Sequence, residues 1–141
     1  MTPIKSFPML GDHVDMLVTQ DMTGGASATL VETSPPGGGP PPHQHQNEDE
    51  TFFVVEGEYE FLVDGQWIKA SAGDAFYRAR GTLHTFRNCG SRMGKILIFV
   101  TPGGFQSYLE EISPLSVPGD LGKLLEISRR YGITFPGIAA P

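Results

Sequence analysis

Three of the four histidines of this chain fall in two short stretches whose spacing could assemble a metal site. His43 and His45 are two residues apart, and alternate side chains of an extended strand point to the same side. Glu50 follows after a polar run that can turn the chain back beside these imidazoles. His84 comes later, where a barrel could place it opposite the first three. The sequence therefore predicts a site of three imidazoles and one carboxylate.

This set of side chains favours a particular class of metal. Imidazole and carboxylate together suit Fe, Mn, Ni, Cu, Co or Zn better than Mg or Ca, which prefer shells made only of oxygen. Four protein ligands leave room for one or two more, so water, oxygen or a bidentate substrate could bind there. Such an open position is typical of a reactive metal rather than a closed structural zinc.

The composition predicts the kind of fold that must position these residues. Glycine and proline account for 30 of the 141 residues, well above their usual share of about 12%. Long helices therefore cannot dominate, and short strands joined by tight turns are expected. The 39% of hydrophobic residues supplies a core for one domain and excludes disorder, and the absence of a Gly-X-Y period excludes a collagen-like chain.

Charge and cysteine content limit the partners and the compartment. A net charge of -6 repels phosphate backbones and anionic lipids, so we expect neither nucleic acid nor a membrane as a partner. Cys89 is the only cysteine, which excludes an internal disulfide and favours a reducing compartment. The first ten residues lack a signal-peptide core, and the apolar run 96–100 is too short to span a bilayer. We expect a cytoplasmic protein.

Short strand-like runs with turn residues between them fill the middle of the chain, which indicates a sandwich or barrel. Asp64-Gly65 between two such runs is a strong hairpin signal. Before His43, the stretch 34–42 (SPPGGGPPP) predicts a stiff connection that fixes where this histidine emerges. The expected strands are 26–33, 51–56, 59–63, 66–70, 74–78, 83–88 and 95–101.

The period changes after residue 104, where two helices are expected at 105–111 and 120–131. Asp120 could cap the second helix, and Gly132 could end it. We therefore divide the chain into an N-terminal arm at 1–25, a barrel at 26–103 and a helical extension at 104–141 packed on the barrel. The arm could exchange a strand with a second copy, and a homodimer is expected.

Both histidine stretches resemble the two motifs of the cupins, which are small β-barrel proteins. The first motif (Gly, five residues, His-x-His, three or four residues, Glu, six residues, Gly) fits at every position. The second (Gly, five residues, Pro-x-Gly, two residues, His, three residues, Asn) has Ala79 in place of its proline. The matching positions are Gly37, His43, His45, Glu50 and Gly57 in the first motif, and Gly73, Gly81, His84 and Asn88 in the second.

The resemblance implies an all-β fold, a double-stranded β-helix or jelly-roll barrel, with one metal held by His43, His45, Glu50 and His84. Glu48 and Asp49 are alternatives to Glu50 as the oxygen ligand, but Glu50 alone keeps six residues before the motif glycine. The layout is similar to that of small quercetin-dioxygenase-like cupins. That likeness implies an oxidoreductase acting on an enolic or phenolic compound, with one divalent metal: Fe, Mn or Ni first, Zn or Cu as alternatives.

By the same likeness, Glu50 would act as both metal ligand and base. A non-redox isomerase or decarboxylase, or a binding protein without turnover, remains an alternative, because a fold does not determine function. Strand alternation predicts a substrate pocket walled by Phe52 and Val54, on the face of Glu50, and by Phe86, on the face of His84. A basic cluster at Arg78, Arg80, Arg87 and Arg92 could hold an anionic substrate or simply be solvated.

Overall fold

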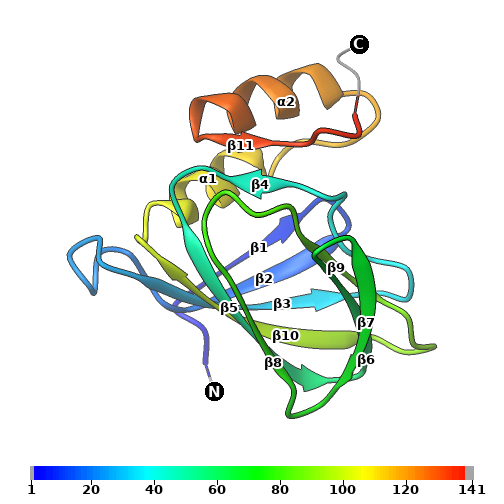
Figure 1. Cartoon of the computed structure of the whole chain (residues 1–141). Helices are drawn as coiled ribbons and strands as arrows, with labels where there is room; N and C mark the ends of the chain where they lie inside the picture. Colours follow the sequence, from blue (N-terminus) through cyan, green and yellow to red (C-terminus); the bar gives the residue numbers. More distant parts are fainter. Residues whose placement is uncertain (1, 139–141) are drawn as a thin grey trace.

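Two β-sheets face each other and two helices lie across one open end in the computed structural model, which describes residues 2–138 (Figure 1). This arrangement confirms the expected jelly-roll barrel with a helical C-terminal part. The strands are β1 Lys5–Met9, β2 Asp12–Val18, β3 Ala28–Ser34, β4 Gln44–His45, β5 Asp49–Glu56, β6 Glu58–Val63, β7 Gln66–Ser71, β8 Ala75–Arg78, β9 Thr85–Asn88, β10 Gly94–Thr101 and β11 Ile133–Thr134. The helices are α1 Phe105–Ile112 and α2 Leu121–Arg130.

The larger sheet has six strands in the order β1-β2-β3-β10-β5-β8. At its centre, Leu97 of β10 is paired with Val31 of β3 on one side and with Phe53 of β5 on the other. Burial alternates along these strands, so that Ile96 and Ile98 of β10 point into the barrel. This period of two is the pattern of strands with one face in the core.

The smaller sheet has the order β7-β6-β9. Its hairpin turns at Asp64 and Gly65, which both have positive φ, at 51° and 81°. A two-residue turn of this kind matches the twist of the flanking strands, which explains the Asp-Gly signal in the sequence. Tyr59 and Phe61 of β6 are buried between the two sheets. The turn therefore sets the register that brings these aromatic rings into the core.

Residues 5–18 of the N-terminal arm form two strands of the larger sheet. β1 lies at the sheet edge and pairs with β2, and Met16 of β2 is paired with Leu30 of β3. Gly11, with a φ of 92°, closes the hairpin between them. Within one chain the arm thus extends the barrel sheet, while strand exchange and homodimer formation stay predictions.

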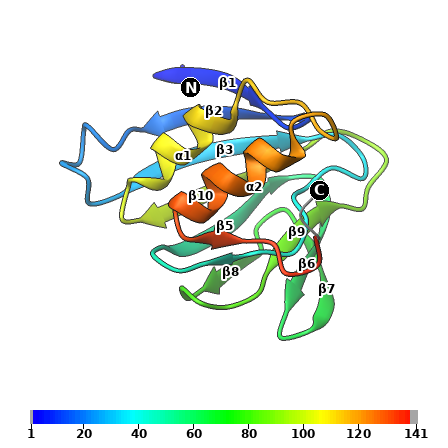
Figure 2. The same ribbon diagram turned by 90° about the horizontal axis from the view of Figure 1, so that it is seen from above.

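Both predicted helices are present, and they lie side by side over the barrel end (Figure 2). Asp120 does not cap α2 with its side chain as expected, because its carboxylate accepts a hydrogen bond from the Ser116 amide at 2.9 Å. After α2 the chain returns as β11 and pairs with β4, so that Ile133 lies opposite His45. Neither described helix is long and apolar enough to cross a membrane.

Candidate metal centre

Four buried side chains meet inside the barrel, and each offers one ligand atom within 4.8 Å of the others. His45 lies in β4 and Glu50 in β5. His43 comes just before β4, and His84 just before β9. The structure thus brings together all four ligands expected from the sequence, and this group could hold a metal ion.

Backbone pairing fixes how His43 and His84 face each other. The amide of each residue donates to the carbonyl of the other at 3.0 Å, which forms an antiparallel bridge. The glycine- and proline-rich stretch before His43 runs along β9, because Gly37 donates to the Asn88 carbonyl and Asn88 donates to the Gly38 carbonyl, both at 2.8 Å. This stretch is therefore pinned to the barrel, and it places His43 as the sequence indicated.

All three imidazoles are oriented by a contact at Nδ1. The Nδ1 atom lies 2.8 Å from the Pro41 carbonyl in His43, 3.0 Å from Glu48 Oε1 in His45 and 3.0 Å from the Thr82 carbonyl in His84. Each contact favours a proton on Nδ1, which leaves Nε2 as the ligand atom. In His45, Nε2 is buried without a hydrogen-bond partner among the described residues. A buried nitrogen without a partner fits a metal ligand, because a bound metal ion would satisfy its lone pair.

Glu50 completes the donor set. Its Oε2 lies 2.9 Å from Nε2 of His84 and 3.7 Å from Nε2 of His45. A neutral His84 that donates from Nδ1 would face this carboxylate with a lone pair, so the close pair needs a proton or a metal cation between its atoms. The donor set and this contact both fit a divalent transition metal.

The pKa values of the two histidines in the first motif shift in opposite directions. Burial, followed by the charges on His45 and His84, lowers the pKa of His43 to about 3. Burial would also lower the pKa of His45, but Glu50 and Glu48 raise it above its ordinary value. Burial would raise the pKa of Glu50, whereas the charge on His45 and the hydrogen bond to His84 lower it to about 2. The site therefore favours a positive charge beside His45 and Glu50.

The two alternative carboxylates lie outside the ligand group. Glu48 is buried and contacts the far side of the His45 ring. Asp49 accepts hydrogen bonds from the Arg80 amide at 2.8 Å and from its guanidinium at 3.0 Å. The supporting role of Glu48 was not predicted, although its position three residues after a histidine ligand was visible in the sequence.

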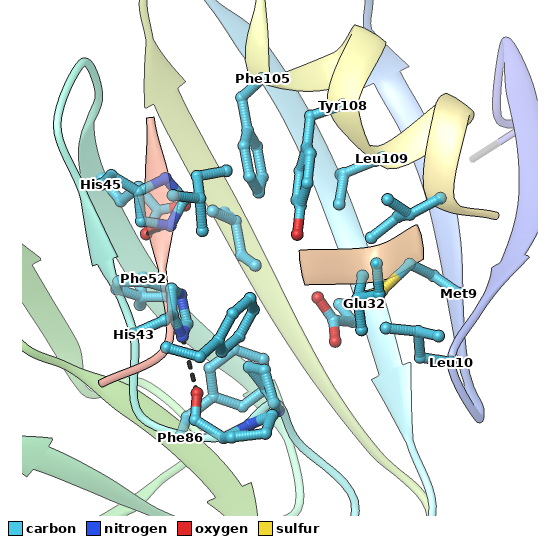
Figure 3. Close-up of a pocket in the computed structure, with 18 of the residues that line it drawn as sticks. Met9, Leu10, Glu32, His43, His45, Phe52, Phe86, Phe105, Tyr108 and Leu109 are labelled. Atoms are coloured by element: carbon cyan, nitrogen blue, oxygen red, sulfur yellow. Dashed lines mark hydrogen bonds and ion pairs between the residues drawn. The ribbon is translucent and has the colours of Figure 1, made fainter. Parts of the chain in front are cut away.

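A cavity of about 80 Å³ lies beside the candidate metal centre and is lined by His43, His45 and Glu50 (Figure 3). Phe52 and Phe86 line it as predicted, whereas Val54 is fully buried elsewhere in the core. Most of the remaining wall is apolar and was missed, chiefly because it comes from segments remote in sequence, although Pro40 and Pro41 come just before His43. The residues missed are Met9, Leu10, Glu32, Pro40, Pro41, Ile98, Phe105, Tyr108, Leu109, Ile112, Leu124, Ile133, Phe135 and Ile138.

The C-terminal part closes this cavity over the histidines. The Phe105 ring lies edge-on to His45 with 5.0 Å between centroids, and Phe135 lies 5.6 Å from His43. Behind Phe105, the Tyr108 hydroxyl and the Ser128 hydroxyl are 2.7 Å apart and link α1 to α2. The helices therefore form the upper wall of the site.

A family model described as "Cupin domain" matches residues 30–100, which is half of the chain. The chain belongs to the cupin family. Among curated proteins, this cupin is 28% identical over 105 residues to "Quercetin 2,3-dioxygenase" of Bacillus subtilis (strain 168). The match covers 74% of this cupin but 31% of the relative, so the chain spans about a third of the relative's length.

Solved structures of other proteins have the same fold. One neighbour, described as a predicted oxalate decarboxylase from Thermotoga maritima, is 25% identical with a TM-score of 0.60, over 70% of this cupin and 90% of that chain. Another, KdgF from Halomonas sp., is 22% identical with a TM-score of 0.59, over 65% and 79%. The second likeness supports the fold alone.

The charges around this cupin cavity limit what it can hold. No arginine or lysine is among the described residues that line the cavity. Three members of the predicted basic cluster pair with acidic residues instead, namely Arg78 with Asp64, Arg80 with Asp49 and Arg87 with Glu60. An anionic group in the cavity would therefore have to be neutralised at the metal centre itself.

Proposed function

We propose that this cupin is a metal-dependent dioxygenase that acts on a small enolic or phenolic compound. The observation that carries the proposal is a buried set of three imidazoles and one carboxylate, of which His43, His45 and Glu50 line a cavity with an apolar wall. The likeness to a quercetin dioxygenase supports the same reaction class. An enol or phenol offers one oxygen for the metal and an apolar body for the wall.

The size of the cavity narrows the substrate. An engineered cavity of about 150 Å³ holds one benzene molecule, and the space beside these histidines is about 80 Å³. A single-ring ligand would therefore fill this cavity and extend through its open side, and a three-ring flavonol is much too large for it. The proposed substrate is therefore smaller than quercetin, with its metal-binding oxygen next to the ring or double bond that reacts.

The residues around the centre have separate tasks in this proposal. A bound Fe or Mn would polarise the substrate oxygen and provide redox chemistry. The pKa of Glu50 is about 2, so its carboxylate is ionised at neutral pH. It would therefore accept a hydrogen bond from the substrate hydroxyl, and with so low a pKa it would hold that proton only weakly. Phe52, Phe86 and Phe105 exclude water from the reacting atoms.

The test is oxygen uptake by protein loaded with Fe(II) or Mn(II), measured over a panel of small enols, diketones and phenols. We expect at least one compound to be consumed with matching oxygen uptake, and His84→Ala to abolish it. His13→Ala is the matched control, because His13 is exposed and contacts Asp15 away from the site. Absence of oxygen uptake over the whole panel would contradict the proposal.

A non-redox reaction is the second candidate, because one structural neighbour is described as a predicted oxalate decarboxylase. Zn-loaded protein under anaerobic conditions separates the two candidates. Product formation there, with no requirement for oxygen, would identify an isomerase or decarboxylase. Ligand binding without any product, with every metal tested, would identify a binding protein.

A further inference from the structure

A second carboxyl lies inside the cavity, on a strand that supplies no metal ligand. Glu32 is in the middle of β3, and its strand partners Val14 and Ile96 are completely buried. Figure 3 shows the Glu32 carboxyl across the cavity from His43 and His45. Apart from the metal centre, the wall around it is almost entirely apolar. A polar group in this position faces whatever occupies the cavity.

The Glu32 carboxyl lacks the partners that a buried acid requires. The side chain is 4% exposed, and Oε2 has no hydrogen-bond partner among the described residues. Burial, a hydrogen bond with Asp12, and the charges of Asp12 and Glu50 raise the pKa of Glu32 well above its ordinary value. Burial and these neighbouring groups thus favour the protonated form of Glu32.

We propose that Glu32 is a specificity-determining residue, whose carboxyl binds a hydroxyl group of the ligand held at the metal centre. The inference rests on the proposed function, because it needs a ligand bound at the metal from the opposite side. The substrate would then carry a second polar group, on the edge that points away from its metal-binding oxygen. The predicted substrate class is a small enol or phenol with one further hydroxyl.

A hydroxyl fits this position better than other polar groups. A neutral carboxyl both donates and accepts hydrogen bonds, and so does a hydroxyl, so the two can pair whichever oxygen holds the proton. A ligand carboxylate or phosphate at this edge would meet Glu32 and Asp12 without any nearby lysine or arginine. A methyl group there would leave the Glu32 carboxyl unsatisfied.

Asp12 shows why a purely structural role does not account for Glu32. Asp12 accepts a hydrogen bond from the Ser34 hydroxyl at 3.0 Å, and, in addition to burial, its hydrogen bond and charge raise the pKa of Glu32. A Glu32 carboxyl that faced away from the cavity could make the same contact with Asp12. Glu32 instead lines the cavity, where the Phe52 and Phe86 rings form the opposite wall. The two roles make different predictions for ligand selectivity.

The test uses two pyranone chelators that differ in one group. Kojic acid has a hydroxymethyl where allomaltol has a methyl, and both bind metals through the same enol and ketone oxygens. Dissociation constants are measured with Zn-loaded protein, which binds without redox turnover. We expect the wild type to bind kojic acid about tenfold more tightly than allomaltol, because allomaltol leaves the buried carboxyl unpaired.

Three variants separate the contribution of Glu32 from a general change in the cavity. Glu32→Met should remove the preference for kojic acid, while Glu32→Gln, which keeps a donor and an acceptor, should retain most of it. Leu109→Met is the matched control, because Leu109 lines the same cavity without a polar group, and it should keep the wild-type ratio.

Infrared difference spectra provide a second measurement. A neutral carboxyl band should be present in the metal-free protein, absent in Glu32→Gln, and shifted by kojic acid in the Zn-loaded protein but not by allomaltol.

Two negative results have different meanings. If neither chelator binds the Zn-loaded wild type, the metal-dependent function is overturned, and the role of Glu32 is overturned with it. If both bind, but the ratio is the same in the wild type and Glu32→Met, only the role of Glu32 is overturned.

Discussion

Single residues that contact Nδ1 of the three imidazoles orient these rings in the metal centre. Backbone carbonyls of Pro41 and Thr82 contact two of the rings, and these carbonyls cannot be removed by substitution. Only His45 has a side chain behind it, the buried carboxylate of Glu48. A carboxylate in this position fixes the tautomer and increases the basicity of the ligand nitrogen. Glu48 is therefore the position at which this support can be tested.

Glu48→Gln should weaken metal binding by about tenfold, at the lower end of the range for supporting groups, because the amide oxygen still accepts a hydrogen bond from Nδ1. Competition with a chelator of known affinity measures the change. Asp49→Asn is the control, since its partner Arg80 lies outside the ligand group. Equal metal affinity in both variants would show that the Glu48 charge does not support His45.

Glu32 makes a prediction about stability as a function of pH. Its pKa is raised in the folded protein, chiefly by burial, then by Asp12 and Glu50, so the folded state holds its proton over a range where the unfolded state releases it. The contribution to stability is complete below the unfolded pKa of about 4.5, and it is lost as the pH rises toward the folded pKa. Tyr59 is a further titratable group within electrostatic range of this carboxyl, since burial and, in smaller part, the charge of Glu32 raise the pKa of Tyr59.

Glu32→Gln removes this titration without changing the shape of the side chain. Urea unfolding of metal-free protein between pH 5 and pH 8, a range chosen to lie above the unfolded pKa of roughly 4.5, should show the variant gaining stability relative to the wild type as the pH rises. Glu60→Gln is a control on an exposed ion pair with Arg87. A constant difference between Glu32→Gln and the wild type across this range would mean that Glu32 is ionised in the folded protein.

Among the elements, the stretch before β4 positions His43 through a close approach of two backbones. Gly39 has a φ of 140°, and a Cβ at this position would lie 2.1 Å from the Phe86 carbonyl oxygen. Gly37 also has a positive φ, of 79°, but a Cβ there would contact nothing within 4 Å. Substitution of Gly39 therefore tests the contact with β9, whereas substitution of Gly37 tests only the strain of a left-handed backbone.

Gly39→Ala should push the stretch away from β9, displace His43 and weaken metal binding, besides costing about 1–3 kcal/mol of stability through overpacking. Gly37→Ala should cost about 1–2 kcal/mol from its backbone conformation alone and leave metal affinity unchanged. Thermal unfolding and metal titration measure the two effects. If Gly39→Ala binds metal as tightly as Gly37→Ala, the close approach does not position His43.

Three of the ligands could be predicted from the sequence because their geometry is local: His43 and His45 are two residues apart, and Glu50 follows after a short turn. His84 meets them only through the long-range bridge with His43, and the spacing of the second motif predicted it. In contrast, β4 has two residues and depends on pairing with β11, almost ninety positions away. The upper wall of the cavity was missed for the same reason, since Phe105 and Phe135 reach the histidines only through tertiary packing. Glu32 was missed because a single acid on a strand gives no sign of whether it faces water or a cavity.

At the scale of the whole molecule, a metal would connect parts of the barrel that no covalent bond joins. Its ligands come from β5 in the larger sheet, from β4 beneath the C-terminal extension, and from the residue preceding β9 in the smaller sheet. Unfolding separates these segments, so the unfolded chain cannot keep the site. Binding to the folded state alone therefore adds stability by mass action.

Removing the metal with EDTA should lower the melting temperature by several degrees. At a free metal concentration a hundred times the dissociation constant, binding adds about 2.7 kcal/mol, and each kcal/mol corresponds to about 2–8 °C for domains near this size. Differential scanning calorimetry with and without EDTA measures the shift, on wild-type protein shown by elemental analysis to contain metal. His84→Ala should melt at the same temperature in both conditions, because it loses one of four ligands, whereas the exposed control His13→Ala should keep the full shift. If metal-loaded wild type melts at the same temperature after chelation, the metal does not hold the two sheets and the C-terminal extension together.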